Sequence, residues 1–328
     1  MLNQSSEDDF TVVGLLNVTD TNIPLFIVFL LIFLVTLSGN LILITVVIMD
    51  QSLQTPMYFF LSNLSFLEIW YTTTIVPKLL VNLLLKSNTI SFAGCMTQLF
   101  FFVSFGATEC YLLLAMAYDR YMAICKPLYY SRLMDTRTCL QLVAGSWVTG
   151  MMTGLIPSLL ISKLDFCDSH QINHFFCDIP PLLEISCSDI YLTEISIFIL
   201  SLIVLFGSLM LTLVSYLSIV ISILKIKSNS ARNKSFSTCG AHLTVVLLYY
   251  GTMIFMYVRP HSNYSSHMKK FVSVFYTVIT PGLNPIIYSL RNKEVRGSLK
   301  KIVRRMLPQL QDITKKNLSV HRNISCIF

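Results

Sequence analysis

Hydrophobic residues along this chain gather in long, unbroken stretches instead of alternating with polar ones. Five stretches contain no Asp, Glu, Lys or Arg, and these cover residues 21–49, 138–162, 195–224, 235–258 and 271–290. Two more, roughly 57–85 and 91–117, are similar but carry Glu68, Lys78 and Glu109. A helix needs about 20 apolar residues to cross the hydrocarbon core of a bilayer. The pattern therefore predicts seven membrane-spanning helices joined by short polar links.

The spans are predicted to be helical because lipid offers no hydrogen-bond partner, so each backbone amide must be satisfied within its own segment. A membrane β-barrel would need shorter strands of alternating polarity, and these stretches do not alternate. Only 12% of the residues are charged, whereas about 25% is usual in soluble proteins. One such stretch could be a buried core helix, but seven together indicate an all-α membrane protein, a seven-transmembrane helix bundle.

The chain reads as one domain with short ends. We expect an extracellular N-terminus over residues 1–22, the transmembrane domain over 23–290, and a cytoplasmic amphipathic helix and tail over 291–328. A short eighth helix is predicted at 292–307 and would lie along the membrane surface, because one of its sides collects Val295, Leu299, Ile302, Val303 and Met306.

The basic residues predict the orientation. Of the 24 Lys and Arg residues, six fall on the side of the N-terminus and eighteen on the other. Basic residues gather on the cytoplasmic side of membrane proteins, so the N-terminus is expected outside a plasma membrane. The net charge of +7 then reflects the basic cytoplasmic links and does not indicate a nucleic-acid partner; membrane lipid is the expected surrounding. The first residues have no basic leader, so the first span should direct insertion. Asn3 and Asn17 begin predicted glycosylation sequons.

Four cysteines fall on the predicted outer side, namely Cys95, Cys167, Cys177 and Cys187. In an oxidising compartment they predict two disulfides, and their spacing leaves all three connectivities open. His170 and His174 lie beside them, so a metal site is the alternative. Oxidation of the cysteines to each other is the favoured interpretation, and no metal site is predicted.

Two motifs suggest moving parts. Asp119 and Arg120 stand together at the cytoplasmic end of span 3, where they predict an ion pair that can open or remain an ordinary interfacial pair. In span 7, Pro281 and Pro285 remove two backbone donors and predict a kink. Asn284 is expected to satisfy a freed carbonyl there; a static kink is the alternative.

With these motifs on spans 3 and 7, the chain resembles the rhodopsin-like G-protein-coupled receptors. Gly39-Asn40 in span 1 and Trp147 in span 4 belong to the same pattern. Within that class it resembles the olfactory receptors. The matching segments are PMYFFLSNLS at 56–65, MAYDRY at 116–121, Ser215-Tyr216, KSFSTCGAH at 234–242 and PIIYSLRNK at 285–293.

The resemblance implies properties that the composition does not show. It pairs Cys95 with Cys177 and Cys167 with Cys187. It implies coupling to a heterotrimeric stimulatory G protein of the olfactory type, which raises cyclic AMP. The implied switch toward that G protein comprises Asp119, Arg120, Tyr121, Tyr216, His242, Asn284, Pro285 and Tyr288.

Glu68 and Glu109 each lie about halfway along a span, so the two carboxylates could face each other. Carboxylates within a membrane are costly and usually functional. Two of them side by side require a bound cation or a proton. The resemblance favours a sodium or protonation site here, although the family commonly has Asp where Glu68 stands. No other cofactor is expected.

A ligand pocket is expected in the outer half of the bundle, between spans 3, 5, 6 and 7. The candidate residues are Phe102, Phe105, Gly106, Ser201, Leu205, Tyr250, Met253, Ile254, Tyr257, Val274 and Thr277. Such stripes also serve ordinary packing. As a lining, this mostly apolar set suits a small, volatile, weakly polar odorant.

Other classes of protein fit less well. The spans contain no HExxH or GxSxG motif, so an enzyme is not expected. A transporter would predict internal repeats or matched broken helices, and no repeat is visible. An adhesion protein would need a large outer domain.

Overall fold

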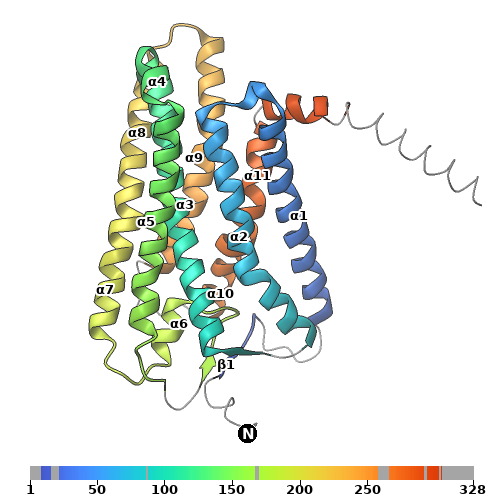
Figure 1. Cartoon of the computed structure of the whole chain (residues 1–328), viewed down its shortest axis with the longest axis vertical. Coiled ribbons are helices and arrows are strands. Elements are labelled where there is room, and N and C mark those ends of the chain that lie inside the picture. Colours follow the sequence, from blue (N-terminus) through green and yellow to red (C-terminus); the bar gives the residue numbers. More distant parts are fainter. Residues whose placement is uncertain are drawn as a thin grey trace, which may run out of the picture.

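The computed structural model describes residues 9–15, 22–85, 88–166, 170–257, 266–291, 294–302 and 304. Seven long helical segments form a bundle, as the sequence predicts (Figure 1). They are α1 (Asn22–Met49), α2 (Pro56–Leu85), α3 (Phe92–Cys125), α5 (Thr136–Ile161), α7 to α8 (Tyr191–Leu224), α9 (Asn229–Tyr257) and α10 to α11 (Ser266–Arg291). Three shorter helices lie in the links: η1 (Gln51–Leu53), α4 (Pro127–Leu133) and α6 (Ile179–Glu184).

The outer surface of the bundle suits a bilayer. Five of the helical segments are long and apolar enough on their own to span one, including Ile23–Met49 and Tyr191–Leu224. Large apolar side chains such as Leu31 and Leu217 are more than half exposed on these helices. α2 is more polar, but it packs along α1 and α3 throughout the bundle. The chain is therefore a multi-pass membrane protein.

Two helical segments contain a π-helical turn. η2 (Leu202–Phe206) joins α7 (Tyr191–Ser201) to α8 (Gly207–Leu224), and η3 (Phe275–Ile279) joins α10 (Ser266–Val274) to α11 (Thr280–Arg291). Such turns are rare and often mark functional sites. The hydrophobic pattern gives no sign of them, because one wider turn leaves a long apolar run unchanged.

The proline region of α11 is completed by α1. Pro285 has no N–H, so the carbonyl of Pro281 lacks its helical donor. Asn40 of α1 supplies one, with Nδ2 at 3.4 Å from that carbonyl oxygen. The expectation that Asn284 would serve the freed carbonyl is wrong, because the Asn284 amide donates to Glu68 instead. Gly39 permits this approach, since an added Cβ would lie 3.2 Å from Pro285 Cγ.

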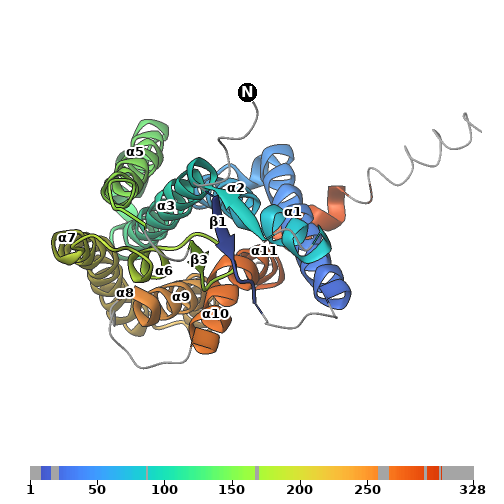
Figure 2. The same cartoon turned by 90° about the horizontal axis from the view of Figure 1, so that it is seen from below.

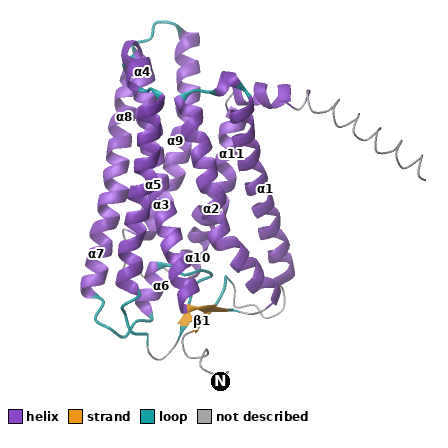
Figure 3. Ribbon diagram, in the orientation of Figure 1, coloured by secondary structure: helices purple, strands orange, loops and turns teal. Residues whose placement is uncertain are grey.

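A small sheet covers one end of the bundle and was not predicted (Figures 2 and 3). β1 (Asp9–Val12) lies between β2 (Thr89–Ser91), which is antiparallel to it, and β3 (Gln171–Ile172), which is parallel. Phe10 and Val12 on alternate positions are buried. Residues 9–12 are thus a structured part of the domain. We call this end of the bundle the strand end and the other the Arg120 end.

The strand end is held by a disulfide between Cys95, in the first turn of α3, and Cys177, in the link before α6. This is the pairing that the resemblance implies. Cys187 is also disulfide-bonded, while its expected partner Cys167 lies outside the described residues. The predicted sequons at Asn3 and Asn17 lie outside them too.

The predicted eighth helix is present over residues 294–302 and extends sideways from the bundle at the Arg120 end (Figure 1). Val295 and Ile302 are buried and Leu299 packs beside them, which confirms the amphipathic pattern. Val303 and Met306 are not among the described residues. Tyr58 of α2 donates to Glu294 at 2.8 Å, and Lys301 lies 3.6 Å from Asp50. These contacts fasten the helix to the α1–α2 link.

Candidate functional site

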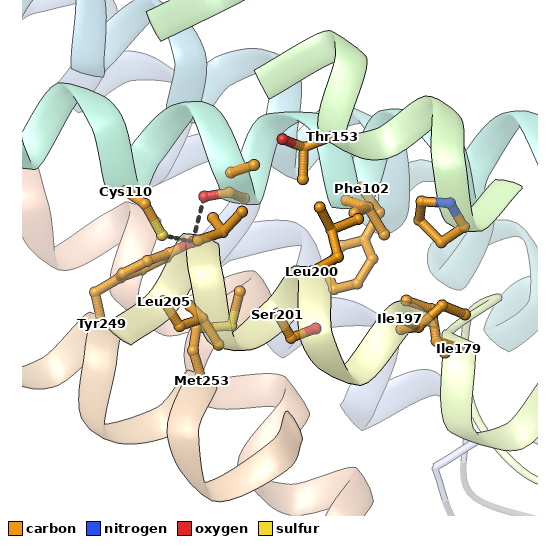
Figure 4. Close-up of a pocket in the computed structure, with 15 residues that line it drawn as sticks. Phe102, Cys110, Thr153, Ile179, Ile197, Leu200, Ser201, Leu205, Tyr249 and Met253 are labelled. Carbon is orange, nitrogen blue, oxygen red and sulfur yellow. Dashed lines mark hydrogen bonds between the residues drawn. The ribbon is translucent and has the colours of Figure 1, made fainter. Parts of the chain in front are cut away.

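A pocket opens between α3, α5, η2 and α9, toward the strand end (Figure 4). It contains about 530 Å³ of empty space, its open side included. Its lining comprises Phe102, Val103, Gly106, Ala107, Cys110, Thr153, Pro157, Ile179, Ile197, Leu200, Ser201, Val204, Leu205, Tyr249 and Met253. None of these side chains is charged, so the pocket suits a neutral molecule.

The structure brings part of the predicted pocket set together. Phe102, Gly106, Ser201, Leu205 and Met253 line the pocket. The others do not: Phe105, Tyr250 and Thr277 are buried elsewhere, Ile254 and Val274 pack against the core, and the side chain of Tyr257 is not described.

The pocket is lined by the fourth span, whereas the seventh span was expected to line it. Thr153 and Pro157 of α5 form one wall, whereas α10 and α11 supply no lining residue among those described. The reason lies in the rotation of α3. Its pocket face runs through residues 102, 103, 106, 107 and 110. Phe105 points to the flank instead, where its ring meets Trp147 edge-on at 6.1 Å.

The hydroxyl of Tyr249 belongs to a set of bonds between helices at the pocket, and Tyr250 next to it extends that set. Tyr249 donates to the carbonyl oxygen of Gly106 at 2.6 Å, and the Cys110 thiol lies 3.9 Å from the Tyr249 oxygen (Figure 4). Tyr250 donates to Ser208 Oγ at 2.8 Å. Through these bonds α9 is connected to α3 and α8 directly beneath the pocket. A molecule that shifts Tyr249 would therefore move α9.

Cys110 and Tyr249 were missed by sequence reasoning. Cys110 stands one helical turn after Gly106, and Tyr249 one turn before Met253, so both continue stripes that had been identified.

A polar cluster lies in the middle of the bundle. Glu68 and Glu109 are buried, and Asn284 donates to Glu68 Oε1. The two carboxyl groups are close enough to interact electrostatically. Four buried oxygens nearby have no hydrogen-bond partner among the described residues: Glu68 Oε2, Glu109 Oε1, Asn284 Oδ1 and the Tyr71 hydroxyl. Unpaired buried oxygens are rare and need an explanation. Carboxylate and amide oxygens are the kind of ligand that a hard cation binds.

The Arg120 end holds the predicted switch residues, with a different bonding pattern. Asp119 Oδ1 accepts a hydrogen bond from Tyr130 of α4 at 2.8 Å. Asp119 Oδ2 and Arg120 Nε have no hydrogen-bond partner among the residues described. The predicted Asp119–Arg120 ion pair is thus replaced by a bond to Tyr130, because the α4 link folds under the end of α3.

Farther across this end, Tyr216 of α8 and His242 of α9 face each other. The tyrosine oxygen lies 2.5 Å from His242 Nδ1, and the two rings stack. Tyr288 of α11 is buried, and within the described structure its hydroxyl has no partner. Pro285 is buried against α1, and Tyr121 is half-buried. The Tyr216–His242 bond therefore connects α8 to α9 at this end.

Comparison with known proteins identifies the family. A family model described as "Olfactory receptor" matches residues 29–306. Olfactory receptor 11L1 of Homo sapiens is 54% identical over 314 residues, which are 96% of this chain and 98% of that protein. Olfactory receptor 5AR1 of Mus musculus is 48% identical over 301 residues, 92% of this chain and 97% of that protein.

The chain belongs to the olfactory receptor family.

Members of this family are G-protein-coupled receptors that detect odorants, and they are not enzymes. The pocket toward the strand end is the candidate odorant site, and the Arg120 end is the candidate contact with the G protein. The buried carboxyl groups lie on the helices that join the two.

Proposed function

We propose that this receptor binds a small, neutral, volatile odorant in the pocket between α3, α5, η2 and α9. The observation that carries the proposal is a lining of apolar side chains with the hydroxyls of Thr153 and Ser201 and no charge. Burial would supply most of the affinity, and one or two hydrogen bonds would orient the ligand.

Gly106 offers the sharpest test of the pocket. A Cβ added there would lie 3.4 Å from both Met253 Cε and the Tyr249 oxygen, so a larger side chain must occupy the ligand's space. With a volatile that activates the receptor, Gly106→Leu should raise the half-maximal concentration at least about tenfold, which equals about 1.4 kcal/mol. Gly207→Leu is the matched control because nothing lies within 4 Å of its Cβ position. Equal responses in both variants would place the odorant elsewhere.

We also propose the orientation of the receptor in the plasma membrane: strand end outside, C-terminus in the cytoplasm. The Cys95–Cys177 disulfide supports this, because such bonds persist in oxidising compartments. The excess of basic residues toward the Arg120 end agrees with it. An N-terminal epitope tag should be stained on intact cells and a C-terminal tag only after permeabilisation; the reverse pattern would refute the orientation.

The partner that we propose at the Arg120 end is a stimulatory G protein of the olfactory type, which raises cyclic AMP. This is supported by Arg120 Nε and the Tyr288 hydroxyl, which have no hydrogen-bond partner among the described residues, and by the nearby Tyr216–His242 bond between α8 and α9. Separation of α9 from α3 would expose Arg120 to a partner. Odorant should raise cyclic AMP only in cells that contain the stimulatory G protein. Ligand-driven current or uptake without any G protein would favour transport.

A second proposal concerns Glu68 and Glu109, which we infer hold a sodium ion or a shared proton. Their unpaired oxygens support the inference. A sodium ion bound there would neutralise part of the negative charge of the two carboxylates. It would also connect α2, which carries Glu68, to α3, which carries Glu109. At sodium about ten times above its dissociation constant, the free energy of unfolding should rise by about 1.4 kcal/mol relative to choline chloride. If sodium does not raise the free energy of unfolding but a lower pH does, the site holds a proton.

A further inference from the structure

A groove separate from the odorant pocket runs along the membrane-facing side of the bundle. It lies between α3, α5 and α8 in the half toward the Arg120 end, and it contains about 1420 Å³ of empty space, its open side included. Each helix contributes one face, such as Tyr118 and Tyr121 from α3, Gln141 and Gly145 from α5, and Ser218 from α8. Lining residues such as Tyr118, Gln141 and Gly145 are exposed on the outside of the bundle, so the groove is open to lipid.

Two small residues, one on each wall, leave room within the groove. Gly145 is exposed, and nothing lies within 4 Å of where its Cβ would be. Ala115 is a small residue on the opposite wall. Along α5 the lining runs from Thr138 to Thr149, which is a length of about 16 Å at 1.5 Å per residue.

Some polar side chains of the groove are bonded within the protein, and others are not. The Ser218 hydroxyl donates a hydrogen bond to the carbonyl oxygen of Val214 at 3.1 Å. Gln141 and Tyr118, by contrast, are exposed, and within the described part of the chain their side chains make no hydrogen bond. Gln141 lies about 7.5 Å and Tyr118 about 10 Å from the helix ends at the Arg120 end. Both side chains are thus free to bond a ligand whose polar end lies near the membrane surface.

The lining selects among membrane lipids. No lining side chain of the groove is charged, so nothing there compensates the phosphate of a phospholipid headgroup. A flexible acyl chain would lose conformational freedom on being fixed, whereas a rigid ring system would lose little. A sterol combines a rigid apolar body with one hydroxyl at its end. We propose that this groove is a sterol-binding site, with Gln141 and Tyr118 bonded to the sterol hydroxyl.

The position of the groove gives a bound sterol a route to the switch. Tyr121 follows Arg120 directly and lines the groove. Ser215 and Ser218 flank Tyr216, whose hydroxyl meets His242. A sterol in the groove therefore contacts the α3 and α8 segments that carry Arg120 and Tyr216. Binding itself does not depend on which odorant or G protein the receptor uses.

Photolabelling of the full-length receptor in cell membranes tests the site. The probe is a cholesterol analogue with a diazirine on the ring system and a free 3-hydroxyl, and the labelled peptides are identified by mass spectrometry. Label should appear in peptides from α3, α5 and α8, and excess cholesterol should compete for it. Label confined to other helices, or equal competition by phosphatidylcholine, would overturn the proposal.

Two variants sharpen the result. Gly145→Phe should fill the groove without touching protein and reduce labelling about tenfold, whereas Gly207→Phe, at another open glycine position, should label as the natural chain does. Gln141→Leu should weaken cholesterol competition about three- to tenfold, the loss expected for one hydrogen bond, and should not weaken competition by 3-deoxycholesterol. Surface staining shows that each variant is folded. Undiminished labelling of Gly145→Phe, or equal effects of Gln141→Leu on both competitors, would refute the site.

Discussion

Asn284 on α11 donates a hydrogen bond to Glu68 on α2, and both side chains are buried. The bond lies beside Pro285, where α11 cannot make its regular backbone bond to Pro281. Asn40 of α1 donates to that carbonyl in its place. The seventh helix is therefore attached to its two neighbours by side-chain amides at the point where its own ladder is interrupted.

Replacement of Asn284 should be costly. Asn284→Leu leaves the Glu68 carboxyl buried without its donor, and such a loss costs about 1–3 kcal/mol or more when the group is charged. Thermal unfolding in detergent should show a clear fall in the midpoint. Asn63→Leu is the control, because Asn63 lies on the same α2 and only returns a bond to the carbonyl of Phe59; its effect should be within about 0.5 kcal/mol. If both variants lower the unfolding midpoint equally, the bond between Asn284 and Glu68 does not stabilise the receptor.

The contact between α3 and α5 depends on glycine. An added Cβ at Gly150 would lie 2.9 Å from both the carbonyl oxygen of Ser104 and the backbone N of Thr108. Gly150→Ala should therefore push the helices apart and destabilise the receptor by about 1–3 kcal/mol. Gly145→Ala, on the same helix with nothing within 4 Å, should be neutral. The test is to compare the unfolding midpoints of the two variants. Equal midpoints would contradict the close packing of α3 against α5 at Gly150.

The sheet at the strand end depends on Phe10. This ring is 1% exposed and meets Phe166 edge-on at 5.2 Å. Phe10→Ala should cost about 3–5 kcal/mol, as for other buried aromatic rings, and should lower surface expression. Thr11→Ala, on the half-exposed position next to it, should express normally. Normal surface staining of Phe10→Ala would mean that β1 is dispensable.

Acid should weaken the strand end through His174. Burial, with Lys270 and Lys269 nearby, lowers the pKa of His174 to about 3, against about 6.5 in an unfolded chain. Between these values only the unfolded chain binds the proton. The stability from neutral His174 is thus complete above about pH 6.5 and falls by up to about 1.4 kcal/mol per pH unit below it. Unfolding midpoints between pH 7.5 and 5 should show this slope.

His174→Gln should flatten that slope. The histidine Nε2 lies 3.2 Å from Ser273 Oγ, and an amide can replace this bond without taking up a proton. If the natural receptor and His174→Gln lose stability in parallel as the pH falls, other groups are responsible.

The sequence predicts those features that depend on local pattern. The seven spans, the eighth helix and the residues Phe102, Gly106 and Met253 follow from runs and spacings along single segments. The sheet does not, because β1 is four residues long and pairs with strands far along the chain. The partners of Asp119 and Asn284 likewise lie on other helices, as do Thr153 and Pro157 in the pocket wall. These partners and the pocket wall depend on how the helices pack against each other, which the pattern of a single segment does not reveal.

The receptor account rests most directly on Arg120, whose Nε has no partner among the described residues in this state. The measurement is odorant-evoked cyclic AMP in cells that contain the stimulatory G protein, with Arg120→Ala beside the natural chain at matched surface levels. We predict that Arg120→Ala abolishes the response. An undiminished cyclic AMP response in Arg120→Ala would contradict the account.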